Sequence, residues 1–282
     1  MQIGFNLLLW TPEFQPDTHH GLVTSLKETG YDGVELPFFA PNLELAKRTG
    51  KLLADEGMRS TAVTIMPGEH ASCISPDPAS RRAAVDHLKQ VVDCCHAAGS
   101  EVLMGPFHQV LGVFSGTGPT ETELEHGAEV HREVAEYAQQ AGIQICVEWL
   151  NRFECYFLTT MAGAADYTRR VNHPNFATMF DTFHANIEEK NPVAALRAGY
   201  DTVKHIHISE NDRGTPGTGH AAIRETLEFL KETGYDRWIT VEAFGLALPE
   251  IAAATKVWRP LFPSEKEVYT EGIRYIRECW GS

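Results

Sequence analysis

Short apolar runs alternate with amphipathic helical segments along the whole chain. The run "QIGFNLLL" at 2–9 predicts a first strand. The stretch "GLVTSLKETGYDGVEL" at 21–36 then predicts a helix, a stop at Gly30 and a second strand that ends on Glu35. The same unit repeats toward the C-terminus. Further helices are predicted at 43–57, 79–99, 126–142, 161–171, 191–199, 222–234 and 264–279, and further strands at 60–65, 101–105, 143–149, 176–181, 203–209 and 238–244.

Strict alternation of strands and helices at this length favours a closed (β/α)8 barrel over an open doubly wound sheet. The 282 residues, 43% of them hydrophobic, are enough to bury a substantial core. We find no linker or change of composition, so residues 1–282 are expected to form a single domain with its active site at the C-terminal ends of the strands. No dinucleotide-binding or P-loop glycine motif follows a strand.

The charge of the chain narrows the choice of partner. A formal net charge of −14 and no visible cluster of Lys and Arg argue against a nucleic-acid surface, and they suit a small neutral substrate better. No apolar run approaches the roughly 18 residues that span a bilayer. The opening "MQIGFNLLLW" also lacks the basic start of a signal peptide. We therefore expect a cytoplasmic protein with no membrane partner, whose six cysteines, none in a C-x-x-C pair, are free thiols.

Polar residues stand where the last four predicted strands end. Glu148, Asp181, His207 and Glu242 are separated by 33, 26 and 35 residues, about one strand and helix each. In a barrel all four would point into one mouth, where three carboxylates repel one another and lose their hydration. A divalent metal ion resolves that conflict. Oxygen-rich ligation with one nitrogen favours Mn²⁺, Mg²⁺ or Co²⁺ over a structural Zn²⁺.

Three longer stretches resemble a known family. "LNRFE" at 150–154, "DTFHANIEE" at 181–189 and "NDRGTPGTG" at 211–219, preceded by "HIHISE", are similar to the ketose 3-epimerases of the D-tagatose and D-psicose type. These enzymes belong to the xylose-isomerase-like barrel superfamily. The similarity in element order runs essentially from end to end and includes "VWRP" at 257–260.

The resemblance implies an activity and a cofactor. It implies an isomerase that inverts C3 of a free ketose, with one divalent ion, Mn²⁺ first, held by Glu148, Asp181, His207 and Glu242. Such an ion stabilises an enediolate, and inversion needs two proton carriers on opposite faces of C3. Glu148 and Glu242 are the natural pair. A homo-oligomer, dimer or tetramer, is also implied.

Substrate contacts are expected from several other residues. The resemblance implies that Glu154, His184 and Arg213 bind the sugar near O1 and O2. Taken alone, His184 could be a capping residue, and Arg213 could pair with Asp212 or Glu210 at the surface. His205 is interpreted as a core or supporting histidine one layer deeper than His207.

Two more polar residues lie at or after predicted strands. Glu35 and His108, at the second and fourth strands, are predicted to line the mouth and contact the substrate. An ordinary hydrogen-bonded role is the alternative for each.

Other reactions remain open on the same barrel. An aldose–ketose or hydroxypyruvate-type isomerase, or an inosose-type dehydratase, would use the same metal. A DNA-repair endonuclease would need extra histidines and a basic groove, and a non-catalytic sugar-binding barrel would not need both Glu148 and Glu242. The loops at 64–77, 105–120 and 220–223 depart from the family pattern, and the Trp that usually follows the "PGTG" motif is missing. These departures leave the identity of the ketose open.

Overall fold

Eight parallel strands close into a barrel in the computed structural model, which describes residues 1–281. Each strand pairs with its neighbours in chain order, and β8 pairs with β1. The predicted (β/α)8 fold is confirmed. The strands are β1 (Gln2–Asn6), β2 (Gly33–Pro37), β3 (Arg59–Val63), β4 (Ser100–Gly105), β5 (Gln144–Val147), β6 (Phe176–Asp181), β7 (Val203–Ile208) and β8 (Trp238–Val241).

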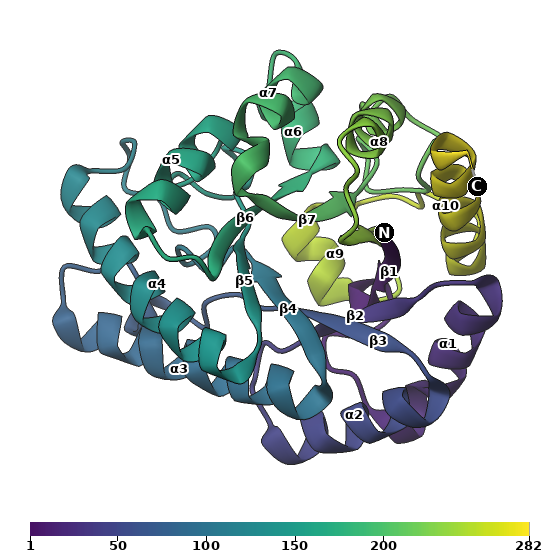
Figure 1. Ribbon diagram of the computed structural model, residues 1–282, viewed down its shortest axis with the longest axis horizontal. Helices are drawn as coiled ribbons and strands as arrows, with labels where there is room; N and C mark the ends of the chain where they lie inside the picture. Colours follow the sequence, from purple (N-terminus) through teal and green to yellow (C-terminus); the bar gives the residue numbers. More distant parts are fainter. Residues whose placement is uncertain (282) are drawn as a thin grey trace.

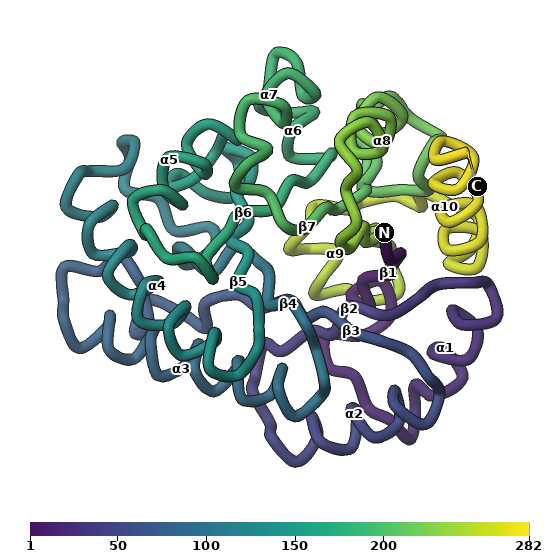
Figure 2. Tube along the Cα trace, in the orientation of Figure 1, coloured from purple at the N-terminus to yellow at the C-terminus, as the bar shows by residue number. Residues whose placement is uncertain are grey.

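Helices surround the barrel and form its outer layer (Figure 1). They are α1 (Pro16–Thr29), α2 (Leu43–Glu56), α3 (Pro78–Ala98), α4 (Glu121–Ala141), α5 (Met161–Val171), α6 (Thr182–Glu188), α7 (Pro192–Gly199), α8 (Ile223–Glu232), α9 (Pro249–Thr255) and α10 (Glu265–Trp280). Figure 2 shows α10 returning to the side of α1, which closes the ring of helices. Tyr31 Oη donates a 2.7 Å hydrogen bond to the carbonyl of Tyr269 across this junction.

The strands alternate between two apolar layers. In β6, Phe176 and Phe180 join the large core between strands and helices, whereas Ala177 and Met179 join the smaller cluster inside the barrel. Because side chains of a strand point to opposite faces in turn, the next inward position is Asp181. The same period leads from Cys146 to Glu148 just beyond β5. Polar side chains at the strand ends therefore face the barrel interior.

A tryptophan occupies the N-terminal part of the barrel interior. Trp238, 3% exposed, belongs to the inner cluster and packs against β1 and β2 at two glycines. A Cβ atom at Gly33 would lie 2.7 Å from the Trp238 ring, and one at Gly4 would lie 3.4 Å from it. Glycine is required at position 33 because the same Cβ atom would also overlap the backbone carbonyl oxygen of Arg59, so the indole and the neighbouring strand leave no space for a side chain.

The structure corrects the sequence prediction in detail. The run at 2–9 is not one strand, because Leu7–Leu9 form a 3-10 helix whose N-cap is Asn6. Two short helices, α6 and α9, were not predicted. The predicted stop at Gly30 is confirmed, since this residue ends α1 with φ 102°. All six cysteines are buried and free, as predicted. None of the helices within residues 1–281 combines the length and apolar character needed to cross a membrane.

The space around Gly33 yields a stability prediction. Gly33→Ala should lower the free energy of unfolding by about 1–3 kcal/mol, because the methyl group would overlap the Arg59 backbone carbonyl and the Trp238 ring. Gly21→Ala is the matched control: a Cβ there meets nothing within 4 Å on α1, so it should add roughly 0.5–1 kcal/mol through helix propensity. Urea denaturation measures both variants. Equal effects of the two substitutions would contradict the packing argument.

Candidate metal and substrate site

Four polar residues meet at the C-terminal end of the barrel, as the sequence predicts. Asp181 is the last residue of β6 and His207 lies in β7, while Glu148 and Glu242 directly follow β5 and β8. All four are at most 5% exposed. Possible ligand atoms of Asp181, His207 and Glu242 lie within 4.8 Å of one another, and those of Glu148, Asp181 and His184 form a second such group. Asp181 joins the two groups.

The ring of His207 is held from one side and open on the other. Its Nε2 lies 2.7 Å from Glu35 Oε1. Its Nδ1 is buried and has no hydrogen-bond partner among the described residues, yet it lies 3.5 Å from Glu242 Oε1 and 3.9 Å from Asp181 Oδ2. A buried nitrogen that faces two carboxylates fits a cation placed between them. The donor set of one imidazole and several carboxylates fits a divalent metal.

Glu35 lies beneath this cluster and does not line the cavity. It is fully buried in the middle of β2, and both carboxylate oxygens are surrounded. Oε1 accepts a hydrogen bond from Asn6 Nδ2 at 3.0 Å and also contacts His207, while Oε2 accepts one from Thr61 Oγ1 at 2.8 Å. His205 Nε2 lies 3.0 Å from Oε2. Although burial opposes it, the charges of the two histidines hold the pKa of Glu35 well below its usual range.

Arg213 is buried among the acids rather than exposed. Its Nη1 donates to Glu242 Oε2 at 2.6 Å and to Asp181 Oδ2 at 3.1 Å. The guanidinium carbon lies 3.7 Å from the ring centroid of Phe183 and 5.0 Å from that of Phe244, so the cation is held between two aromatic faces. The alternative that it pairs with Asp212 or Glu210 at the surface is wrong. Arg213 supplies fixed positive charge to the cluster.

His184 connects the cluster to the loop after β5. Its Nδ1 accepts a 3.1 Å hydrogen bond from the backbone N–H of Asn151, whose side-chain nitrogen donates to Glu154 Oε1 at 2.6 Å. The opposite ring nitrogen, Nε2, lies 3.0 Å from Arg213 Nη2 and 3.7 Å from Glu148 Oε1. Burial, with the charges of Arg213 and His207, lowers the pKa of His184 well below its usual value. The neutral ring is therefore fixed between Asn151 and the cluster.

The three carboxylates differ in their affinity for a proton. Burial, followed by the charge of Glu242, raises the pKa of Glu148 well above its usual range. Burial also raises the pKa of Asp181, to about 6, although Arg213 opposes the shift. For Glu242 burial is again the largest influence, but Arg213 and His207 overcome it and lower the pKa. The protein alone therefore does not compensate all three negative charges.

A cavity of about 130 Å³ opens above the cluster. Its polar lining consists of Glu148, Glu154, His184, Arg213 and Glu242 from the segments after the strands, together with Thr255 from α9. Predicted substrate residues Glu154, His184 and Arg213 are thus brought together, while Glu35 and His108 are absent from the lining. The α9 contribution was missed, because seven residues of "PEIAAAT" carry too short a pattern to indicate a wall of the cavity.

His108 lies behind the wall of the cavity. It is fully buried, both ring nitrogens lack hydrogen-bond partners among the described residues, and the ring stacks on Phe157 with centroids 5.6 Å apart. Burial, together with nearby His131, lowers the pKa of His108 to about 3. This placement keeps the imidazole neutral at physiological pH.

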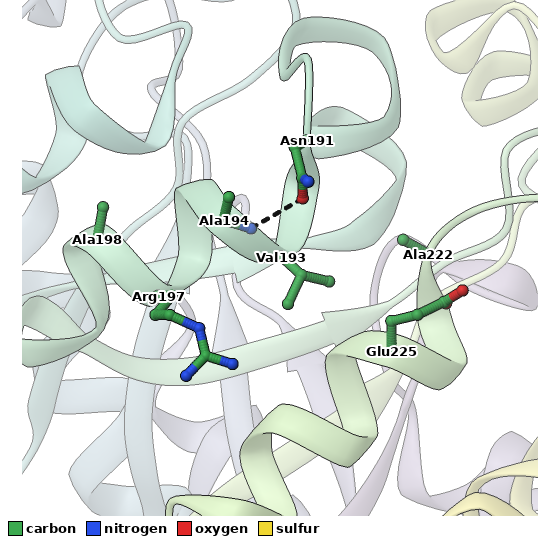
Figure 3. Close-up of a pocket in the computed structure, with 7 residues that line it drawn as sticks. All are labelled: Asn191, Val193, Ala194, Arg197, Ala198, Ala222 and Glu225. Carbon is green, nitrogen blue, oxygen red and sulfur yellow. Dashed lines mark hydrogen bonds between the residues drawn. The ribbon is translucent and has the colours of Figure 1, made fainter.

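A larger groove lies on the outer layer, away from the cluster. Figure 3 shows it between α7 and α8, with a volume of about 700 Å³. Asn191 caps α7 here by accepting a 3.0 Å hydrogen bond from the Ala194 N–H. The charged residues that line this groove are Arg197 and Glu225. Size does not identify a functional site, and the convergent polar groups favour the smaller cavity.

Comparisons with known proteins agree with this geometry. A family model described as "Xylose isomerase-like TIM barrel" matches residues 23–279. A Synechocystis sp. protein named "Probable ketose 3-epimerase" is 28% identical, covering 99% of this chain and 97% of its own. The ketose 3-epimerase of Arthrobacter globiformis is 27% identical, with 99% and 96% covered. The structure of D-allulose 3-epimerase from Methylomonas sp. in complex with D-allulose is 25% identical, with 99% and 96% covered and a TM-score of 0.91. The predicted resemblance is confirmed.

The buried neutral ring of His108 predicts how stability changes with pH. The folded pKa of His108, about 3, lies below the ordinary histidine value of 6.5. The stability that comes from burying the neutral ring is therefore fully present above pH 6.5 and is lost as the pH falls below that value. His108→Leu should therefore reduce the loss of unfolding free energy between about pH 7.5 and about pH 5.0 by about 2 kcal/mol.

Urea denaturation at the two pH values measures this difference. Gln139→Leu, at an exposed position of α4 that carries no titratable group, is the control and should leave the pH dependence unchanged. The argument fails if His108→Leu retains the full acid loss of the parent protein.

Proposed function

The chain belongs to the xylose isomerase-like TIM barrel family, and we propose that it is a metal-dependent epimerase that inverts C3 of a free ketose. One observation carries the proposal: the open Nδ1 of His207 faces Asp181 and Glu242 at the end of the barrel where Glu148 also lies. Relatives named ketose 3-epimerases that cover nearly the whole chain support the reaction. The chain would act as a single (β/α)8 domain.

Glu148, Asp181, His207 and Glu242 would hold the divalent ion. When bound, the ion acts as a Lewis acid that makes the C3 proton easier to remove by stabilising negative charge on the neighbouring oxygens. We propose Mn²⁺, with Mg²⁺ or Co²⁺ as alternatives, because the donor set is rich in oxygen. The homo-oligomeric state and the cytoplasmic location remain predictions.

Glu148 and Glu242 would move the proton. They follow β5 and β8, which are separated by β6 and β7 in the closed sheet, so they approach the cavity from different sides. One carboxylate removes the proton from C3 and the other delivers a proton to the opposite face. Which of the two acts as the base depends on the epimer that binds.

Glu154, His184 and Arg213 would orient the substrate. Hydrogen bonds through Asn151 fix the positions of His184 and Glu154 relative to each other. Arg213 contacts Glu242 and approaches His184, so it can bring a donor to a sugar oxygen beside the proton carriers. We assign these three residues to O1 and O2 of the ketose.

Glu35 would act through His207 rather than on the sugar. By holding Nε2 it directs Nδ1 of His207 toward the two carboxylates. A carboxylate that orients a metal-binding histidine typically changes metal affinity about 10–100-fold when it is altered.

Solvent deuterium tests the reaction. A panel of free ketoses incubated with the metal-loaded protein in D₂O should yield an epimer that carries deuterium at C3, detected by NMR. Glu148→Gln and Glu242→Gln should each reduce epimerisation by roughly 10²-fold or more, because each removes a proton carrier. Glu129→Gln, at an exposed position on α4, is the control.

The site of labelling separates the competing reactions. Deuterium confined to C1 or C2 with formation of an aldose would establish an aldose–ketose isomerase instead. Loss of water from the sugar would establish a dehydratase.

Metal affinity tests the position of Glu35. Glu35→Gln should weaken Mn²⁺ binding about 10–100-fold, because a neutral amide holds Nε2 of His207 less firmly than a carboxylate does. Isothermal titration calorimetry measures the binding without relying on turnover, and circular dichroism checks the fold. Glu129→Gln should bind the ion like the parent protein. Parent-like affinity in Glu35→Gln would remove this role from Glu35.

A further inference from the structure

Outside the acidic cluster the lining of the cavity is almost entirely apolar. Side chains from separate parts of the chain form it, among them Leu8 after β1, Phe39 after β2, Leu111 after β4 and Ile251 on α9. Phe39 and Ile251 are partly exposed and pack against the inner apolar cluster. In Figure 1, α9 lies inside the ring formed by the other helices. This apolar wall, the part of the lining outside the cluster, is therefore hydrocarbon apart from Thr255.

Polar side chains are almost absent from the apolar wall. Thr255 is the single polar side chain of the lining outside the cluster, and its hydroxyl donates a 2.7 Å hydrogen bond to the carbonyl of Ile251. At the backbone, the Val63 carbonyl accepts from Phe38 N–H at 2.9 Å. The Phe244 N–H donates to the Arg213 carbonyl at 3.0 Å. A sugar hydroxyl that entered here would lose its water and meet few free partners.

The polar end fixes which part of a ketose reaches this wall. If the proposed function is correct, C3 lies between Glu148 and Glu242, and O1 and O2 lie near Glu154, His184 and Arg213. The chain from C4 onward then extends toward Ile251 and Leu111. Its last carbon, C6, is the part of the sugar farthest from the acids.

We propose that the preferred substrate is a 6-deoxy-2-ketohexose, a ketose whose chain ends in a methyl group. This inference rests on the proposed function and names its substrate class. A terminal methyl gains from contact with the hydrocarbon wall, whereas a terminal hydroxyl loses hydrogen bonds to water. The reaction itself is unchanged, since one proton leaves C3 and one returns to its other face. Ile251 is the specificity-determining residue.

Matched pairs of sugars test the substrate class. Kinetics with L-fructose and 6-deoxy-L-fructose, and with D-psicose and 6-deoxy-D-psicose, give a ratio of kcat/KM for each pair after correction for the open-chain fraction. In the better pair the 6-deoxy sugar should be favoured about tenfold or more. A ratio of one or below in both pairs would overturn the proposal.

Substitution of the wall provides the second arm. Ile251→Thr places a hydroxyl in the wall and should reduce the 6-deoxy preference at least about fivefold, while Leu43→Thr, at an exposed position that begins α2, should leave the ratio unchanged. The equilibrium between the ring and open-chain forms is a property of the sugar alone, so its effect on the kcat/KM ratio is the same for every protein variant. Leu111→Thr provides the same test if Ile251→Thr does not fold. An unchanged ratio in the folded wall variants would overturn the role of this wall.

Failure of this inference is distinguishable from failure of the proposed function. If no sugar gains deuterium at C3, the proposed epimerase activity is wrong. If each 6-deoxy sugar and its 6-hydroxy counterpart are epimerised with equal kcat/KM after correction for the open-chain fraction, the epimerase activity is correct and the proposed substrate class is wrong.

Discussion

Mutual repulsion among three buried carboxylates is the physical constraint on which the rest of the site depends. Glu148, Asp181 and Glu242 are each at most 5% exposed, so water cannot screen their charges. Arg213 contacts two of them, and the aromatic faces of Phe183 and Phe244 hold its guanidinium in place. Burial nevertheless raises the pKa of Glu148 and Asp181. This incomplete compensation gives a divalent cation a favourable place to bind.

The barrel creates this constraint through its simple strand period. In β6 the inward positions Ala177 and Met179 are small or apolar and the acid Asp181 stands at the C-terminal end, whereas β2 carries the buried acid Glu35 in its middle. The apolar layers stabilise the barrel, so the polar ends need contribute little to folding. Because the C-terminal ends of the strands are not needed for packing the core, they can carry the residues of an active site.

The sequence predicted most of this arrangement for physical reasons. A buried carboxylate or imidazole at the end of an apolar strand is costly unless it is paired. The positions of Asp181 and His207 at predicted strand ends therefore indicated a site with a bound cation. Depth along the barrel was predicted for His205, which is fully buried beside Glu35, but not for Glu35 itself. Glu35 was placed at the mouth because its strand was expected to end there, yet β2 continues to Pro37 and carries Glu35 into the layer below. Residues of α9 were missed because a seven-residue helix has too few turns to show a period.

The origin of α9 has a consequence for how this protein could diverge. The helix is inserted between β8 and α10, so it lies outside the repeating strand–helix unit that carries the acids. Its exposed and partly exposed side chains can be exchanged by mutation without altering the inward positions of β5 to β8. The part of the cavity wall that α9 supplies is thus encoded apart from the strand ends that carry the acids. Substitutions in this seven-residue helix therefore change the surface that meets the ligand while the residues at the strand ends stay the same.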